Sequence, residues 1–215
     1  MAKSIRERFL ANLSRASGAF QGSLQQGDPY RAPIKDYTWG SNKGKAMQAR
    51  LYQLVALHNT DPRLSETSLA AALEYAHYIH GVNPLGLVYL TNMATAGASH
   101  SAATMFHGWF ARGTRWQRVT EQLPGPPPGF LVGGPNPQFS IDACCRTPAG
   151  SPAYRCYGAR TFSLCQQNLR PPLAQPSAKS YLQYNDPWPV NSWEVTEPSL
   201  SYQSYYVRLL AAFTR

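Results

Sequence analysis

Long apolar runs are missing from this 215-residue sequence, and so is a clustered basic segment. No stretch approaches the roughly 18 apolar residues that a membrane-spanning helix needs. Residues 1–20 carry scattered charges and no continuous apolar core, so they do not resemble a secretory signal. The 20 lysines and arginines outnumber the 11 acidic residues, but they are dispersed, and no helix-turn-helix, zinc-finger or RNP pattern accompanies them. We therefore expect neither a membrane nor a nucleic acid as a partner.

Charged residues are also scarce, at 14% of the chain, whereas aromatic residues reach 12%. The hydrophobic content of 43% excludes generic disorder and is enough for a domain with its own core. A surface with few charges and many Tyr and Trp side chains suits a neutral, polar, ring-shaped ligand better than a polyanion.

Helical periodicity dominates the sequence, and strand-like alternation is not apparent. Ser41 or Asn42 can cap a helix, and Asp61-Pro62 is a typical helix start. The predicted helices cover 6–20, 43–57, 62–80, 101–110 and 198–214. Their apolar faces comprise Met47, Leu51, Leu54, Val55 and His58 in the second, Leu69, Leu73, Ala76 and Ile79 in the third, and Tyr202, Tyr206, Leu209, Leu210 and Phe213 in the last. The pattern predicts an all-α fold and a single domain over residues 1–215.

Residues 124–198 have a different character, because fourteen of the 18 prolines lie there. Such a stretch cannot form long regular helices. Irregular segments of this length inside a domain are usually functional or disordered, and the many Trp and Tyr residues favour an ordered, functional segment.

All four cysteines lie in this region, at Cys144, Cys145, Cys156 and Cys165. Two disulfides are the favoured interpretation, and they would imply an oxidising compartment. Free thiols and a metal site remain alternatives, but the spacing is not that of a zinc site and no histidine lies among the cysteines. We expect no metal and no cofactor.

Acidic and aromatic residues alternate near the C-terminus, where Glu194 and Glu197 follow Asp186 along the chain. Glycoside hydrolysis uses such a combination, because a carboxylic acid protonates the leaving oxygen while aromatic rings stack on sugar faces. A purely structural interpretation is also available, since Glu197 would interact favourably with the positive end of the helix that follows it.

Four segments in this order resemble glycoside hydrolase family 9, a cellulase family with an (α/α)6 barrel. They are HYIHGVNPLGLVYLTNM at 77–93, MFHGWF at 105–110, PPPGFLVGGPN at 126–136 and WPVNSWEVTEPSLSYQS at 188–204. The resemblance covers roughly residues 28–213. It implies an inverting hydrolase acting on β-1,4-glucan such as cellulose or cello-oligosaccharides, and a secreted or periplasmic location.

The resemblance also implies roles for individual residues. In the family signature an aromatic residue precedes the catalytic acid by four positions and an amide follows it by six. Glu197 has Trp193 and Gln203 at these positions, although the amide is usually Asn, and Glu194 is the fallback. His107 and His100 correspond to a histidine near the bound sugar or are structural, whereas His58, His77 and His80 are expected to be structural. Sugar contacts are expected from Trp188, Trp193, Trp109, Tyr184 and Tyr202.

The sequence departs from the family in its length and in its catalytic base. Family barrels are about twice as long, and their base lies in an Asp-Ala-Gly-Asp segment that does not occur here. Asp186 or a second chain would have to supply the base. We expect the last five or six helices of a barrel, with apolar faces that pair with another copy or with a missing N-terminal half. The alternative to an enzyme is a non-catalytic carbohydrate-binding remnant.

Overall fold

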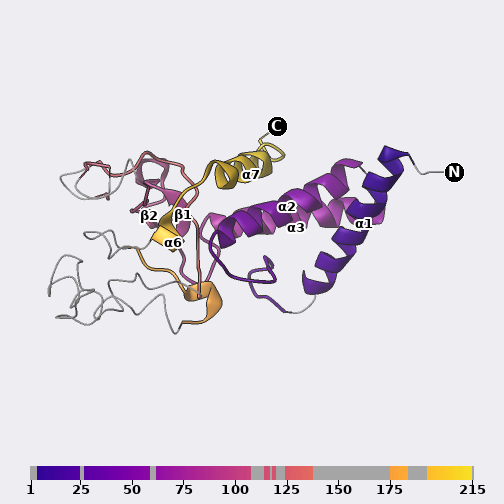
Figure 1. Ribbon diagram of the computed structural model, residues 1–215, viewed down its shortest axis with the longest axis horizontal. Coiled ribbons are helices and arrows are strands. Elements are labelled where there is room, and N and C mark those ends of the chain that lie inside the picture. Colours follow the sequence, from indigo (N-terminus) through magenta and orange to yellow (C-terminus); the bar gives the residue numbers. More distant parts are fainter. Residues whose placement is uncertain are drawn as a thin grey trace, which may run out of the picture.

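The structure of the 215-residue chain is a computed structural model (Figure 1). It describes residues 4–24, 27–58, 62–107, 114–116, 118–119, 124–137, 175–183 and 193–214. Helices account for most of the regular secondary structure among the described residues, namely α1 (Ile5–Leu24), α2 (Ser41–His58), α3 (Pro62–Ile79), α6 (Trp193–Thr196) and α7 (Leu200–Leu210). The remaining elements are β1 (Val88–Thr91), β2 (Ser101–Ala102) and two single 3-10 turns, η1 (Ala94–Ala96) and η2 (Ser177–Lys179).

Helices α2 and α3 lie side by side and form the centre of the molecule, with α1 and α7 both packed against α2 (Figure 1). Small alanines allow the helices to approach closely, and tyrosines fill the remaining space. The core side chains contributed by this pair are Ala46, Ala49, Tyr52 and Val55 of α2 and Ala71, Ala72, Tyr75, Ala76 and Ile79 of α3. Both predicted helices are confirmed, and their ends differ from the predicted 43–57 and 62–80 by at most two residues.

The predicted apolar faces of α2 and α3 are only partly correct. Val55, Ala76 and Ile79 are buried as expected, but Met47 is 42% exposed, and Leu69 and Leu73 are also exposed. The buried face consists mainly of alanine and tyrosine, which the periodicity of the large aliphatic residues does not indicate. In α7 the prediction is better, because Tyr206 and Leu209 are buried and the other members of the expected face are partly buried against the core.

The helix predicted over 101–110 is wrong at its start, where the chain forms β2 instead. β2 pairs in parallel with β1, which the sequence analysis also did not predict. The backbone groups of this segment bond across the fold: the His100 carbonyl accepts from Val88 N–H, and the Ala102 carbonyl accepts from Asn92 N–H. The side chain of Gln183 accepts from the N–H groups of the two residues that follow β2. These long-range bonds outweigh the local helical preference of the sequence.

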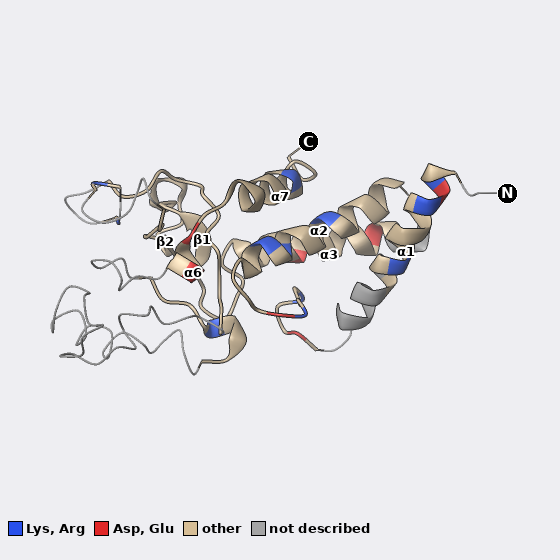
Figure 2. Cartoon of the chain, viewed as in Figure 1, with Lys and Arg blue, Asp and Glu red and all other residues tan. Residues whose placement is uncertain are grey.

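Charged side chains are spread over several elements (Figure 2). Basic residues occur on α1, on α2 and near the end of α7, as the dispersed sequence pattern indicates. Among the described residues, no helix combines the length and the apolar character needed to cross a lipid bilayer.

Candidate active site

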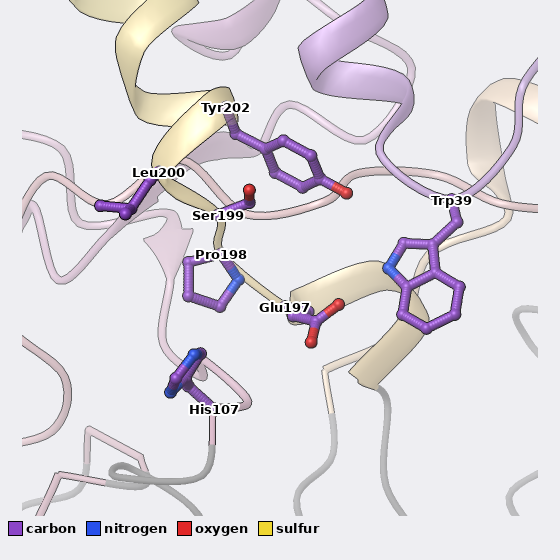
Figure 3. Close-up of a pocket in the computed structure, with 7 residues that line it drawn as sticks. All are labelled: Trp39, His107, Glu197, Pro198, Ser199, Leu200 and Tyr202. Atoms are coloured by element: carbon purple, nitrogen blue, oxygen red, sulfur yellow. The ribbon is translucent and has the colours of Figure 1, made fainter.

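The Glu197 side chain lines an open pocket of about 420 Å³ between the short helix α6 and the start of α7 (Figure 3). Figure 3 shows the carboxyl group with the Trp39 ring on one side and His107 on another, and with Tyr202 projecting from α7. The described residues that line the pocket are Trp39, His107, Glu197, Pro198, Ser199, Leu200 and Tyr202. One carboxyl group, two aromatic rings and one imidazole therefore face a common space.

Local backbone geometry fixes the position of Glu197. Its N–H donates to the Trp193 carbonyl at 2.7 Å and closes the single turn of α6. Pro198 then forms an isolated antiparallel bridge with Val132. The Ser199 side chain accepts from Ser201 N–H at 3.2 Å and is the N-cap of α7, so this helix begins at Leu200 and not at Pro198 as predicted.

The Gly-Gly-Pro-Asn loop at 133–136 connects α6 to the start of α2. Gly134 N–H donates to the Val195 carbonyl at 2.9 Å, and Asn42 N–H donates to the Gly133 carbonyl at 3.0 Å. The Asn42 side chain also donates to the Val132 carbonyl at 3.0 Å. A Cβ atom at Gly134 would collide with the Asn42 side chain, and the φ of Gly134 is +90°. Glycine is thus required at position 134, and the motif serves to support the α6 turn.

Gln203 holds the same loop from the side of α7. Its Oε1 accepts from Leu131 N–H at 2.9 Å, and its Nε2 donates to the Gly129 carbonyl at 2.9 Å. Both the oxygen and the nitrogen of the Gln203 amide are therefore hydrogen-bonded. The glutamine that replaces the more usual asparagine of the signature thus still links the 126–136 segment to the Glu197 segment.

The electrostatic surroundings of Glu197 favour the protonated form. Burial raises the pKa of the Glu197 carboxyl above its ordinary value. A hydrogen bond from Trp39 and the charge of His107 act in the opposite direction, and the negative charge of Glu194 adds to the rise. The net effect on the pKa is upward, which is the direction that a general acid needs.

Glu194 occupies a different environment, although it is only three residues away in the sequence. Its side chain is 4% exposed, and Asn136 Nδ2 donates to its Oε2 at 3.1 Å. It is not among the described residues that line the pocket. The structure therefore separates the two predicted carboxylates: Glu197 faces the pocket, and Glu194 joins α6 to the Gly-Gly-Pro-Asn loop.

Of the predicted aromatic and histidine residues that the structure describes, some line the pocket and others do not. Tyr202 and His107 line the pocket. Trp193 is not among the described lining residues, and its ring meets the Trp39 ring edge-on with a centroid separation of 5.1 Å. His100 is exposed, and its Nδ1 hydrogen-bonds to the Gly86 carbonyl at 2.8 Å, so its side chain links the residue before β2 to the turn before β1.

The three histidines predicted to be structural have contacts within the helical core or at its edge. His80 hydrogen-bonds to the Tyr206 hydroxyl at 2.8 Å, His77 lies 3.7 Å from Glu74, and His58 packs on Phe9. Several further predictions lie outside the described residues, namely those for Asp186, Trp188, Trp109, Tyr184, Cys144, Cys145, Cys156 and Cys165.

Sequence reasoning missed Trp39, which lies more than 150 positions before Glu197 in the chain. The only local signal is a Trp-Gly pair at the end of a loop rich in Gly, Pro and Asp. An aromatic residue in such a loop, immediately before a helix, is a reasonable candidate for a ligand contact.

Known proteins resemble this chain in sequence and in fold. The profile described as glycosyl hydrolase family 9 matches residues 2–210. Endoglucanase C of Cellulomonas fimi is 34% identical over 139 residues, which cover 63% of this chain and 11% of that protein. A xyloglucan-specific endo-β-1,4-glucanase of Bacteroides ovatus is 29% identical over 109 residues, which cover 51% of this chain and 16% of that protein.

Among solved structures, a thermostable endoglucanase of Alicyclobacillus acidocaldarius superimposes with a TM-score of 0.65 at 21% identity. The match covers 98% of this chain and 32% of that structure. The chain thus spans about a third of that structure and a smaller share of the curated relatives. The likeness confirms the predicted all-α class and the partial (α/α)6 barrel. Because the family profile covers nearly the whole chain, the protein belongs to glycosyl hydrolase family 9.

Proposed function

We propose that this chain is the part of a β-1,4-glucan hydrolase that supplies the general acid, Glu197. The observation that carries the proposal is the position of this carboxyl group, which faces an open pocket and has a raised pKa. The alternative acid, Glu194, is buried against Asn136 and does not line the pocket.

The chemistry follows from a carboxylic acid beside a glycosidic oxygen. Glu197 would donate its proton to the leaving oxygen as the C–O bond breaks, and it would be left as a carboxylate. In an inverting reaction, a second carboxylate about 6.5–9.5 Å away removes a proton from the water that attacks the opposite face of the sugar. Glu197 is the single carboxylate among the described residues lining the pocket. The base would therefore come from outside the described residues, with Asp186 as this chain's candidate, or from a second chain.

The proposed substrate is a β-1,4-linked glucan. Two relatives carry the names endoglucanase and xyloglucan-specific endo-β-1,4-glucanase. The rings of Trp39 and Tyr202 line the pocket, where they would pack against the apolar C–H faces of pyranose rings. The low charge of the lining suits a neutral polysaccharide.

A non-catalytic carbohydrate-binding role is the second candidate, and the single carboxylate in the described lining favours it. The two functions are separated by measuring binding and hydrolysis of cellohexaose with the same preparation. The enzyme proposal predicts heat of binding together with new reducing ends. Binding without any release of reducing ends would support the carbohydrate-binding role and overturn the enzyme proposal. Absence of both would overturn the glucan proposal altogether.

A further inference from the structure

Leu200 is the most exposed of the large hydrophobic side chains in the described part of the chain, at 92%. It also lines the pocket that Glu197 faces, only three residues earlier in the sequence. A single exposed leucine on an ordinary surface needs no explanation. On the wall of a pocket, however, an apolar side chain is a surface that a bound ligand removes from water.

The backbone holds Leu200 in a defined place. The Ser199 side chain accepts from Ser201 N–H at 3.2 Å, and the Ser199 carbonyl accepts from Gln203 N–H at 3.0 Å. Leu200 is therefore the first residue of α7, directly after a capped helix start. Because this segment is already ordered, little backbone entropy is lost when the side chain contacts a ligand.

Leu200 and Trp39 lie on opposite sides of the Glu197 carboxyl group. Figure 3 shows Trp39 on one side and Leu200 on the other, with Pro198 between Leu200 and the acid. The lining thus offers apolar groups in both directions from Glu197. A polysaccharide held with a glycosidic bond at this carboxyl group has one sugar unit on each side of the bond.

We propose that Leu200 is a specificity-determining residue, whose side chain packs on the apolar C–H face of the glucose unit that lies across Glu197 from the unit at Trp39. This inference rests on the proposed function and extends it to a second sugar unit. Leucine has no hydrogen-bonding group with which to replace the water around a charged substituent. Its contact therefore favours a neutral glucose unit over one that carries a carboxylate.

The first test locates the ligand by NMR. The native chain is labelled with ¹³C in its leucine methyl groups and saturated with a cellopentaose whose linkages contain sulfur and resist hydrolysis. The Leu200 signals are identified by their loss in Leu200→Ala. They should show nuclear Overhauser effects to sugar C–H protons, on a different glucose unit from the one that contacts the Trp39 ring. Leu69, which is exposed on α3 and is not among the described lining residues, should show none.

The second test measures the affinity for the same ligand by calorimetry. Leu200→Ala should weaken binding about three- to tenfold, because it removes part of the apolar contact. Leu200→Met keeps an apolar side chain of similar volume and should bind nearly as the native chain does. Val207→Ala alters an exposed residue of the same helix outside the described pocket lining, and it should leave the affinity unchanged. Melting temperatures identify any variant whose fold is altered.

The third test addresses specificity with a thio-linked cellopentaose that carries carboxylates at C6. The native chain should bind it more weakly than the neutral ligand. Leu200→Lys should narrow this difference by about two- to fivefold, since a lysine side chain can pair with the carboxylate. Val207→Lys adds the same charge to the same helix and should narrow it less.

The outcomes separate this inference from the proposed function. If the native chain binds the neutral ligand while Leu200→Ala binds it equally well, or while the Leu200 methyl groups show no contact with sugar, the inference is overturned and the glucan proposal stands. If the native chain does not bind the ligand at all, both are overturned. If it binds through Leu200 but does not hydrolyse ordinary cellohexaose, only the enzyme proposal fails.

Discussion

Gly40 lies in direct contact with the ring of Tyr202, with no room for a side chain between them. A Cβ atom at residue 40 would be 2.5 Å from the Tyr202 hydroxyl and 2.8 Å from its Cζ, and the φ of Gly40 is +81°. This contact joins the start of α2 to the first turn of α7. It also brings Trp39 and Tyr202 to the same pocket. The need for glycine at position 40 therefore contributes to the shape of the candidate site.

Gly40→Ala should therefore destabilise the fold and displace Tyr202 from the pocket. The left-handed backbone alone costs roughly 1–2 kcal/mol for a residue with a side chain, and the steric clash adds to this cost. Thermal or urea unfolding of Gly40→Ala, Tyr202→Ala and the double variant provides the measurement. Since the clash disappears without Tyr202, the double variant should lose less stability than the sum of the single losses. Additive losses would show that the two residues do not interact.

Lys45 is a buried cationic residue that the proposed reaction does not use. Its Nζ donates to the Ala32 carbonyl at 2.5 Å and lies 3.7 Å from the centroid of the Tyr78 ring. The Tyr37 ring is 4.9 Å away. Burial lowers the pKa of the ammonium group to about 7, and the charge of Asp28 opposes this change. Through its contacts with Ala32 and Tyr78, Lys45 thus links the loop that precedes Trp39 to the core between α2 and α3.

The lowered pKa predicts a specific pH dependence of stability. Above about pH 7 the folded chain releases the Lys45 proton, whereas the unfolded chain keeps it until its ordinary value of 10.5. The unfolded state then binds more protons, so stability should rise between pH 7 and about pH 9.5, by at most about 1.4 kcal/mol per pH unit from this residue. At higher pH the buried tyrosines, such as Tyr75 and Tyr78 with their raised pKa values, should reverse the trend.

Urea unfolding as a function of pH tests this prediction. Lys45→Met should flatten the rise, while Lys43→Met, two residues earlier on the same helix and less buried, should preserve it. A slope that is the same in Lys45→Met and in the native chain would mean that the tyrosine rings and the Ala32 carbonyl keep Lys45 charged in the fold.

The helix boundaries were predictable from the sequence where local chemistry determines them. The helix α3 begins at Pro62 as predicted, and α2 spans Ser41–His58, which extends the predicted 43–57 by two residues at its start and one at its end. The start of α7 was placed two residues early, because Pro198 pairs with Val132 and Ser199 is the actual cap. β2 was missed altogether, since only its pairing with β1 and the hydrogen bonds that the next two residues donate to the Gln183 side chain favour an extended chain.

The candidate site shows the same division between local and long-range information. Glu197 could be preferred to Glu194 from the spacing of the family signature, and of the two it is Glu197 that lines the pocket. Trp39 could not be assigned a role, because its proximity to Glu197 depends on contacts of α2 with α7 and with the 133–136 loop. Likewise, no sequence pattern distinguishes the exposed Leu69 from the buried Ala72 beside it on α3.

Exposed apolar side chains on the helical pair predict self-association of the isolated chain. Leu57 is 69% exposed, and Leu69 and Leu73 lie one turn apart on the same exposed face of α3. Such surfaces favour contact with a second copy. Sedimentation velocity at micromolar concentration should show a dimer or larger species, and Leu69→Glu combined with Leu73→Glu should shift it toward the monomer. Val82→Glu, an equally polar change at an exposed turn position, is the control. A monomeric native chain would contradict the prediction.

The two carboxylates should respond differently to the same substitution. Glu197→Gln keeps the shape of the side chain and removes the acidic proton, so it should reduce turnover of unactivated cello-oligosaccharides by about 10²-fold or more. Aryl cellobiosides with a good leaving group need little protonation and should lose much less. Steady-state kinetics on both substrate classes provides the measurement, and an equal loss on both would exclude Glu197 as the general acid.

Glu194→Gln should act on stability and on the pH profile and should leave turnover at the optimum largely intact. The neutral amide weakens the bond from Asn136 to the side chain at 194, a loss of about 1 kcal/mol in unfolding free energy. The negative charge of Glu194 raises the pKa of Glu197, so its removal should lower that pKa and move the alkaline limb of the rate profile to lower pH. Because the alkaline limb reports deprotonation of the acid, this shift links the buried Glu194 carboxylate to the partly buried Glu197 carboxyl group that faces the pocket. If Glu194→Gln instead abolished turnover while Glu197→Gln remained active, the acid would lie three positions earlier in the chain than the pocket indicates.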